Sequence, residues 1–517
     1  MASMQMGRRT VLRGAGALAA LGALPGSFGT RSAHAALAFD QNESFTAGHV
    51  RRLAEQLSRQ DFVKPSIPLP ESYRQIGYDR YRDIRFRTDQ AIWRGERLDF
   101  ELQLLPMGWL YEVPVEIWLV EGLQARRVAV DKSLFSFGPL VGDVGSGAPY
   151  GFSGFRVHGP INRPDYFDEC VVFQGASYFR AVGRRQTHGL SARGLTIDTA
   201  RPGGEEFPIF RSFWIEKPEA GQRALTVHAL LDSRSTTGAY KLVIEPGAST
   251  IIDVQATLFP RRVLTHVGLG ALTSMFLHGP GHHRIDDDFR PAVHDSDGLA
   301  ILNGNGECIW RPLTNPRTLQ ASAFMDRSPR GFGLCQRARN FHEFEDLEAR
   351  YERRPSVWIE PKGRWGQGYV ELIEIPTSEE IHDNIVAYWK PAKGPEPGAP
   401  FSFGYKMYWG EDIPIAWSGA KVVATRVGNG RRDGTFLFVV DFSGPAVAGQ
   451  KERPIAMVTS NPGTIANVSV HENPEIEGTR VSFELDPRGS EFCELRMSLS
   501  LGDRQISESW LYRWTTA

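Results

Sequence analysis

Short apolar runs with a two-residue period recur along most of this chain, and each ends at glycine or proline. Examples are "LDFELQLLP", "VPVEIWLVEG", "YKLVIEPG" and "IIDVQATLFP". A two-residue period places alternate side chains on opposite faces of a strand, so each run can bury one face and expose the other. Many short strands separated by turn residues predict an all-β protein built from β-sandwiches.

Only three segments have features of helices. "ESFTAGHVRRLAEQLSRQDF" offers a Ser/Thr cap followed by apolar residues at helical spacing. "NFHEFEDLEARYERRP" places four apolar residues on one helical face and predicts a helix that ends before Pro355. "SEEIHDNIVAYW" predicts one helical turn capped by Ser378.

A segment dense in proline and glycine, "KPAKGPEPGAP" at 390–400, interrupts the strand pattern and predicts a linker. It divides the chain into a large domain over 36–389 and a small one over 401–517, which has the size of an immunoglobulin domain. The alternating apolar residues of 401–409 and 493–501 predict two strands of the small domain.

The first 35 residues have the features of an export signal rather than of a folded segment. Arg8 and Arg9 precede a weakly apolar run, and Ala33-His34-Ala35 matches a signal-peptidase site. The arginine pair is similar to a twin-arginine signal, which predicts export to the periplasm by that pathway. The run of about 11 residues is too short to span a bilayer, which needs roughly 20.

Charge argues against nucleic acid and anionic membranes as partners. Removal of residues 1–35 takes four arginines and no acid from totals of 59 basic and 60 acidic side chains, which leaves 55 and 60 and a net charge of −5. Proteins that bind nucleic acid or anionic lipid concentrate positive charge instead. No second apolar run is long enough for a membrane span, so a neutral partner fits better.

The four cysteines at 170, 308, 335 and 493 are widely scattered, and no CxxC pair is present. Neither a zinc ribbon nor a redox motif is therefore supported. We expect the cysteines to be buried packing residues, and their pairing stays open.

The stretch "HDSDG" at 294–298 invites a calcium or transition-metal interpretation. An EF-hand needs another carboxylate before the glycine and a glutamate at position 12, where this chain has Gly306. Four histidines (278, 282, 283 and 294) lie near Asp286, Asp287 and Asp288, but "HGPGHH" cannot form the helix that would align them. No metal site and no cofactor are expected, with a loop-assembled metal site as the alternative.

Carboxylates and tryptophans share the segment 290–390, which holds Asp295, Glu380, Asp383, Trp358 and Trp389. Cleavage of a glycosidic bond uses two carboxyl groups, one to protonate the leaving oxygen and one to activate water or attack the anomeric carbon. Serine-nucleophile and phosphate-loop motifs are absent from the sequence. The residues alone therefore allow a carbohydrate-active protein, with Trp358 and Trp389 as candidate sugar-binding rings; the alternative is that the tryptophans are core residues and the aspartates are turn residues.

Long strings in the sequence resemble one family. They include "RPDYFDECVVFQGASYFRAVG", "GEEFPIFRSFWIEKP", "FRPAVHDSDGL", "GFGLCQRARNFHEFEDLEARYERRPSVWIEPKG" and "GYVELIEIPTSEEIHDNIVAYW". These strings resemble the osmoregulated periplasmic glucan biosynthesis proteins D and G, and the twin-arginine leader favours the D branch.

The resemblance implies a large β-sandwich of the galactose-mutarotase type followed by an immunoglobulin-like domain. It implies action on β-1,2-linked periplasmic glucans as an inverting glycoside hydrolase, with Asp383 as the general acid and Asp295 as the general base. It also implies that Tyr351, Arg354 and Glu380 bind sugar or relay protons. The sequence departs from the family pattern at Cys308, Glu352 and Arg353.

Two other functions stay open at this point. A transglycosylase would use the same two carboxylates to branch or cyclise the glucan. A non-catalytic glucan-binding protein would act as a scaffold for the membrane glucan synthase. The sequence decides neither between these functions nor whether the protein is a homodimer.

Overall fold

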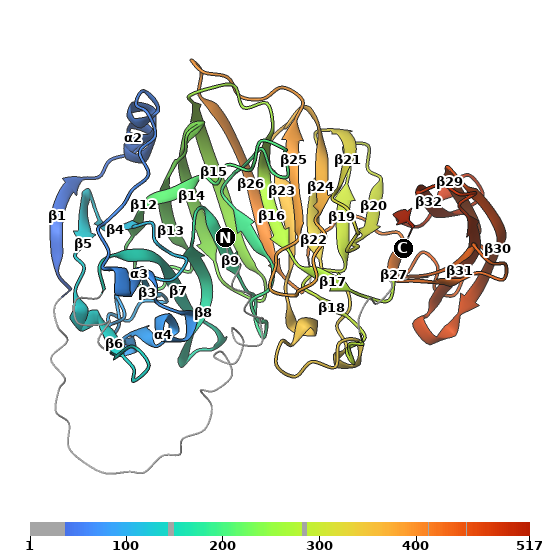
Figure 1. Cartoon of the computed structure of the whole chain (residues 1–517), viewed down its shortest axis with the longest axis horizontal. Helices are drawn as coiled ribbons and strands as arrows, with labels where there is room; N and C mark the ends of the chain where they lie inside the picture. Colours follow the sequence, from blue (N-terminus) through green and yellow to red (C-terminus); the bar gives the residue numbers. More distant parts are fainter. Residues whose placement is uncertain (1–36, 143–148, 282–286, 412, 451, 517) are drawn as a thin grey trace, which may run out of the picture. The chain divides into compact units, whose positions relative to one another are not determined.

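The computed structural model describes residues 37–142, 149–281, 287–411, 413–450 and 452–516 (Figure 1). The predicted leader at 1–35 lies outside the described residues. Nearly all regular structure is strand, which confirms the all-β prediction. Within the described ranges, no helix is long and apolar enough to cross a membrane.

The chain forms two compact units. The first contains the described residues up to Ala271 together with Lys393–Gly410, and the second contains Leu272–Ala392 and the described residues from Glu411 onward. The chain therefore leaves the first unit and returns to it once, so neither unit is a single continuous segment.

Two large sheets build most of the described first unit, beside a two-stranded sheet of β2 (Ile84–Phe86) and β6 (Phe135–Phe137). The larger has the order β1 (Phe39–Ser44), β5 (Gln124–Val128), β4 (Glu116–Glu121), β12 (Ile209–Glu216), β13 (Leu225–Asp232), β14 (Thr236–Glu245), β15 (Thr250–Pro260) and β26 (Phe401–Gly410). The smaller has the order β3 (Glu101–Pro106), β7 (Phe152–Arg163), β8 (Tyr166–Gln174), β9 (Tyr178–Ala181) and β10 (Ser191–Arg193). Neighbouring strands of these sheets are antiparallel except β4 and β12, which run parallel.

Aromatic side chains join the two sheets of the first unit. Phe155 of β7 meets Phe213 of β12 edge to face, with ring centroids 5.1 Å apart. Phe173 of β8 stacks on Phe155 at 4.9 Å and lies 5.4 Å from Phe213. Because these rings come from facing strands and are buried, they form the core of a β-sandwich.

The predicted N-terminal helix is present as α2 (His49–Ser58). Its buried face, Val50 and Ala54, packs against a cluster that includes Trp118 and Trp214. The short helices α3 (Glu71–Arg74) and α4 (Tyr78–Arg82) follow it.

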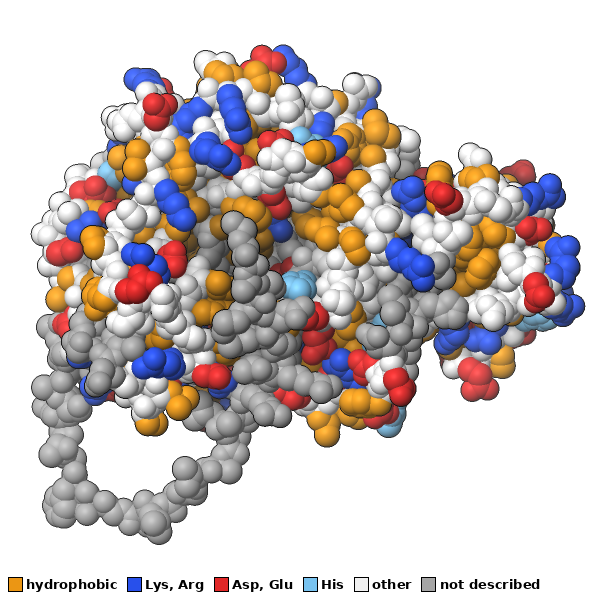
Figure 2. Space-filling view, viewed as in Figure 1, with side chains coloured by type: hydrophobic (Ala, Val, Ile, Leu, Met, Phe, Trp, Pro, Cys, Tyr) orange, Lys and Arg blue, Asp and Glu red, His pale blue; other side chains and the backbone are white. Residues whose placement is uncertain are grey.

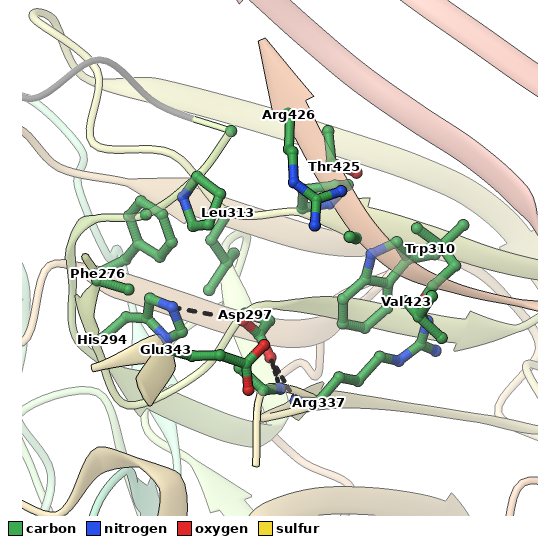
Figure 3. Close-up of a pocket in the computed structure, with 18 residues that line it drawn as sticks. Phe276, His294, Asp297, Trp310, Leu313, Arg337, Glu343, Val423, Thr425 and Arg426 are labelled. Atoms are coloured by element: carbon green, nitrogen blue, oxygen red, sulfur yellow. Dashed lines mark hydrogen bonds and ion pairs between the residues drawn. The ribbon is translucent and has the colours of Figure 1, made fainter. Parts of the chain in front are cut away.

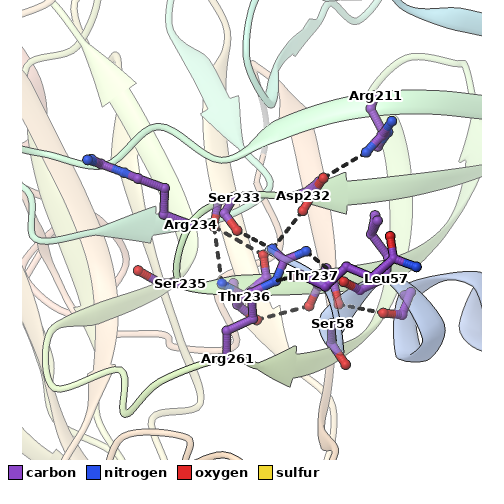
Figure 4. A network of polar contacts seen from close by, with 12 residues as sticks. Leu57, Ser58, Arg211, Asp232, Ser233, Arg234, Ser235, Thr236, Thr237 and Arg261 are labelled. Atoms are coloured by element: carbon purple, nitrogen blue, oxygen red, sulfur yellow. Dashed lines mark hydrogen bonds and ion pairs between the residues drawn. The ribbon is translucent and has the colours of Figure 1, made fainter. Parts of the chain in front are cut away.

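A buried polar network attaches the end of α2 to the sheet (Figure 4). Arg261 donates to the carbonyl oxygens of Leu57 and Gln60 and to Oδ1 of Asp232, each over 2.8 Å. Arg211 donates to the other Asp232 oxygen over 2.8 Å, and the Asp232 side chain is 0% exposed. Thus both oxygens of a fully buried carboxylate are paired with arginine.

Two sets of strands from the large predicted domain lie in the second unit. One set has the order β21 (Gln320–Arg327), β24 (Gln367–Glu374) and β25 (Ile385–Pro391). The other has the order β23 (Ser356–Pro361), β22 (Gly331–Cys335), β19 (Gly298–Leu302) and β20 (Cys308–Pro312). The short strands β17 (Phe276–His278) and β18 (Val293–His294) pair beside them.

The C-terminal part of the second unit is a small sandwich. One sheet contains β27 (Lys421–Asn429), β28 (Phe436–Ser443), β31 (Gly478–Asp486) and β30 (Thr464–Asn473), and the other contains β34 (Ser509–Thr515), β32 (Phe492–Leu501) and β29 (Ile455–Asn461). Phe438 stacks on Phe483 at 5.1 Å and meets Trp510 of the opposite sheet at 5.9 Å. Strand β20 pairs in parallel with β34. The sheet that contains β23, β22, β19 and β20 therefore continues into the small sandwich.

The domain boundary differs from the sequence prediction. The alternating residues of 401–409 do form a strand, β26, but that strand pairs with β15 over nine positions from Leu258↔Phe401 to Thr250↔Trp409. The small sandwich therefore begins after Gly410 rather than at 401. Alternation predicts a strand with one buried face, but it does not say which sheet covers that face.

Two helix predictions are wrong. Residues 340–355 form only the 3₁₀ turns η4 (Phe341–Glu343) and η5 (Tyr351–Arg353). Glu345 and Arg350 have φ angles of 55° and 49°, which no α-helix allows. Residues 378–382 form bends and a turn before β25 instead of a helical turn. In both segments the tertiary contacts described below override the local helical pattern.

The four cysteines are buried and none forms a disulfide, which confirms their expected packing role. The Sγ atom of Cys308 lies 3.6 Å from Oε1 of Glu508. Cys308, one of the positions at which the sequence departs from the family pattern, therefore faces the small sandwich. Acidic and basic side chains are interspersed over the face seen in Figure 2.

Candidate active site

Asp295, the expected base, lies in the short connection between β18 and β19. Its amide N–H donates to the carbonyl oxygen of Met275 over 2.9 Å, and its carboxylate is 0% exposed. Nε of Arg354 lies 3.6 Å from Oδ1 of Asp295 and is itself largely buried. A buried carboxylate needs such a positive partner, because desolvation otherwise opposes its charge.

Asp383, the expected acid, is exposed and lies two residues before β25. Its neighbour Asn384 is buried and clamps the backbone of Phe276: Oδ1 accepts from the Phe276 N–H over 2.8 Å, and Nδ2 donates to the Phe276 carbonyl over 3.0 Å. The backbone N–H of Asp295 bonds to Met275, so Asp295 and the residue after Asp383 are both attached to the dipeptide Met275–Phe276. These two attachments come from segments 88 positions apart in the sequence.

Arg290 connects three loops around this place. Its guanidinium donates to Glu380 over 2.7 Å, to Asp346 over 2.9 Å and to Asp288 over 2.7 Å. Burial opposes ionisation of Asp288, but the hydrogen bonds and charge of Arg290 outweigh it and hold the pKa of Asp288 well below its ordinary value. Burial alone would lower the pKa of Arg290, yet these carboxylates raise it above its ordinary value.

Tyr351 joins the Arg290 cluster to Asp295. Its hydroxyl donates to Oε2 of Glu380 over 3.2 Å, the same oxygen that accepts from Arg290. The guanidinium of Arg354 lies 5.3 Å from the centre of the Tyr351 ring, within the range of a cation–π contact. The structure therefore brings together three residues that the sequence resemblance indicated, Tyr351, Arg354 and Glu380, around Asp295.

Gln336 fixes the turn that carries Tyr351. Its Nε2 donates to the carbonyl oxygens of both His294 and Tyr351 over 3.1 Å, and its Oε1 lies 3.0 Å from Nδ1 of His294. Because Oε1 can only accept, Nδ1 of His294 carries the proton in this contact. One buried amide thus ties the strand that precedes Asp295 to the turn of Tyr351.

Trp358 and Trp389 do not lie at this place as ligand-binding rings. They are 1% and 0% exposed, so neither indole presents a face to a sugar, and this corrects their expected role. Glycine makes room for each: a Cβ on Gly331 would lie 2.3 Å from Trp358, and one on Gly368 would lie 2.6 Å from Trp389. Each ring lies on the buried face of its strand and is therefore part of the core.

Sequence reasoning did not identify Arg290, Gln336 or Asp346 as parts of the site. The sequence indicates Asp288 only as part of a possible metal cluster with His282, His283 and Asp286. These three residues lie outside the described residues. Among the described residues, no group of three or more His, Cys, Asp or Glu side chains is arranged to hold a metal ion. No spacing in the sequence marks Arg290, because its three partners come from separate loops.

A pocket of about 110 Å³ lies beside His294, on the side of the ring that faces Asp297 (Figure 3). All of its lining residues belong to the second unit. Asp297, the second acid of "HDSDG", lies in it, with Oδ2 accepting from the backbone N–H groups of Arg337 and Ala338. Its Oδ1 is 3.4 Å from Nε2 of His294. The two acids of the motif therefore face different surroundings: Asp295 faces Arg354, and Asp297 faces the pocket.

A family model described as "Periplasmic glucan biosynthesis protein, MdoG" matches residues 45–514. Glucans biosynthesis protein G of Vibrio cholerae serotype O1 is 50% identical over 482 residues, which cover 92% of this chain and 88% of the relative. The protein of the same name from Bradyrhizobium diazoefficiens is 45% identical over 511 residues, or 99% of this chain and 100% of the relative.

A third relative, glucans biosynthesis protein G of Shewanella frigidimarina, is 48% identical over 482 residues, or 92% of this chain and 86% of the relative. These relatives are named protein G, which corrects the indication of the D branch drawn from the leader. A galactose mutarotase related enzyme from Lactobacillus acidophilus aligns at a TM-score of 0.21 and 7% identity, over 47% of this chain and 99% of that one, too weakly to support any conclusion. The family match and the three relatives agree: the chain belongs to the periplasmic glucan biosynthesis protein family.

Proposed function

We propose that this protein cleaves β-1,2-glucan backbones as an inverting glycoside hydrolase, with Asp383 as general acid and Asp295 as general base. The observation that supports the proposal best is the shared attachment at Met275–Phe276, to which Asp295 and the neighbour of Asp383 both bond. Glycosidic cleavage needs two carboxyl groups on opposite sides of the bond.

The two carboxylates have different surroundings, and each is assigned one step of the reaction. Asp383 is exposed and can reach the leaving oxygen of a bound chain, to which it would give its proton. Asp295 is buried beside Arg354, which stabilises its ionised form until it accepts a proton from the attacking water. Water bonds to the anomeric carbon as the glycosidic bond breaks, so a β-linkage yields an α-product.

Tyr351, Arg354 and Glu380 are proposed to hold sugar hydroxyls and to orient Asp295. Their mutual contacts support an ordered set of groups, since the Glu380 oxygen accepts from both Tyr351 and Arg290. Such mutual hydrogen bonding fixes the rotamers of groups that must meet a substrate in one geometry. We also propose that the protein is exported by the twin-arginine pathway. It would then act beside the membrane glucan synthase.

The test is digestion of linear β-1,2-glucan by the purified full chain, followed by mass and by NMR of the new reducing ends. We expect shorter linear oligosaccharides with α-anomers formed first. Asp383→Asn should lower the rate by about 10²–10⁴-fold, the usual contribution of a general acid. Asp503→Asn, which removes an exposed carboxylate of the small sandwich, is the matched control and should retain full activity.

Three results would decide against the proposal. Full activity in Asp383→Asn would exclude it as the acid, and β-anomers formed first would exclude inversion. Products that gain no water on cleavage would establish transfer to a sugar hydroxyl instead. Saturable glucan binding without any turnover would establish a binding protein.

A further inference from the structure

The pocket beside His294 has mixed chemistry that the proposed cleavage does not use. Its walls include Asp297, which directly precedes β19, and Trp310 of β20. They also include Val423 and Arg426 from β27 of the small sandwich. Figure 3 shows Arg426 above and Asp297 below in the view, with Leu313 to the left and Trp310 to the right.

The charged side chains that line the pocket balance, because Arg337 and Arg426 are matched by Asp297 and Glu343, so the lining does not select an ion. Outside the lining, Arg337 also pairs with Glu508 over 2.7 Å, and Arg426 pairs with Asp441 over 2.8 Å. Asp297 supplies carboxylate oxygens, while Arg426 supplies N–H groups that Asp441 does not use up, because a guanidinium has five donors. Leu313, Pro312 and Val423 add apolar surface to these polar groups.

A neutral ring with hydroxyls at its rim and C–H groups on its faces fits this combination. The volume of about 110 Å³ is smaller than the roughly 150 Å³ cavity that holds benzene, so the pocket takes up part of a sugar ring and leaves the rest of that ring at its open rim. Val423 is 45% exposed at the rim, which leaves room for a chain to continue into solvent. A single sugar residue within a longer chain has these properties.

The wall from the small sandwich is held in place before any ligand binds. Arg337 donates to the Val422 carbonyl over 2.6 Å, and Glu508 accepts from the Val422 N–H over 2.8 Å. The Arg337 guanidinium also lies 3.5 Å from the centre of the Trp310 ring. Glu508 is 0% exposed, so this is a buried ion pair that fixes β27 against the pocket. A preorganised wall lowers the entropic cost of binding.

We propose that this pocket is a second glucan-binding site, distinct from the cleavage site, that holds one glucosyl residue between Asp297 and Arg426. The sugar class rests on the proposed glucan substrate, whereas the site itself does not depend on cleavage. The small sandwich thereby gains a binding role, because β27 supplies Val423 and Arg426.

Two variants with matched controls test the site. Val423→Trp fills the rim, and Val468→Trp adds the same ring at an equally exposed position of the small sandwich, since both valines are 45% exposed. Arg426→Ala removes a pocket donor and one partner of Asp441. Arg480→Ala removes the other partner of Asp441, which binds over 2.7 and 2.8 Å, and touches no pocket residue.

The measurement is isothermal titration of the full-length Asp383→Asn protein with short β-1,2-linked oligoglucosides. We expect two classes of site in the parent protein. Val423→Trp should abolish one class, and Arg426→Ala should weaken it about tenfold, the effect of one charged hydrogen bond. Both controls should keep two classes.

A single class of site in the parent, or equal losses in Val468→Trp and Arg480→Ala, would overturn the inference. Failure of the proposed function looks different: the wild-type protein would leave glucan uncut while the pocket variants still lost one class of site.

Discussion

Nη1 of Arg290 donates to Oε2 of Glu380 over 2.7 Å, across 90 positions of sequence. The same guanidinium binds Asp288 and Asp346, and the same Glu380 oxygen accepts from Tyr351. The turn that leads to Asp383 is thus attached to the turn that carries Arg354, the partner of Asp295. Arg290 is a positioning residue for the proposed site rather than a group that meets the substrate.

Two replacements of Arg290 should separate the effect of its planar hydrogen-bonding geometry from the effect of its positive charge. Arg290→Met leaves three largely buried carboxylates without their shared cation, so we expect a loss of about 3 kcal/mol in unfolding free energy and a fall in kcat. Arg290→Lys keeps the charge but not the planar fork, so it should restore part of the stability and less of kcat. Urea unfolding and steady-state cleavage of β-1,2-glucan measure both quantities.

The control for Arg290 is Arg87→Met, because Arg87 and its partner Asp89 are 46% and 49% exposed. An exposed pair contributes little, so stability should not change measurably. If Arg290→Met were as stable and as active as the wild type, the positioning role would be wrong.

Loss of Arg261 should release helix α2 from the sheet. Arg261→Ala removes the donors to Leu57 and Gln60 and leaves buried Asp232 with only Arg211. We expect a cost of about 3 kcal/mol and faster amide hydrogen exchange over His49–Ser58. Arg234→Ala is the control, since Arg234 is 71% exposed and 3.9 Å from its carboxylate. Unchanged exchange in α2 would contradict the attachment.

Glu169 in β8 should make the protein less stable in acid. Burial tends to raise its pKa, but the charge of Arg156 and the contact with His188 outweigh burial and lower the pKa to about 2. A lowered pKa contributes stability above the ordinary value of about 4.5, and that contribution is lost as the pH falls toward 2. Between pH 6 and pH 3 the loss from this group amounts to about 2 kcal/mol.

Urea unfolding of wild type and Glu169→Gln at several pH values measures this contribution. The stability difference between the two proteins should shrink by that amount from pH 6 to pH 3. A difference that stays constant over this range would show that Glu169 has an ordinary pKa in the folded protein.

Several features of the fold follow from local pattern. The two-residue alternation predicted strands at 401–409 and 493–501, and both are present. The apolar spacing at the N-terminus predicted α2, but the predicted Ser/Thr cap is wrong, because Gly48 precedes the helix and no side chain caps it. The helix predicted at 340–355 fails for a nonlocal reason: Tyr351 and Phe344 are buried from different turns, while Leu347, expected on the same face, is 75% exposed.

By itself the sequence determined the all-β class, the N-terminal helix and, through its resemblance to a family, the two carboxylates of the proposed reaction. Tertiary structure alone decided that β26 belongs to the first unit, that Trp358 and Trp389 are core residues, and that Arg290 holds three loops together. The physical reason is that alternation specifies only that one face of a strand is buried. Which strand, ring or guanidinium covers that face depends on partners brought together from distant parts of the chain by folding.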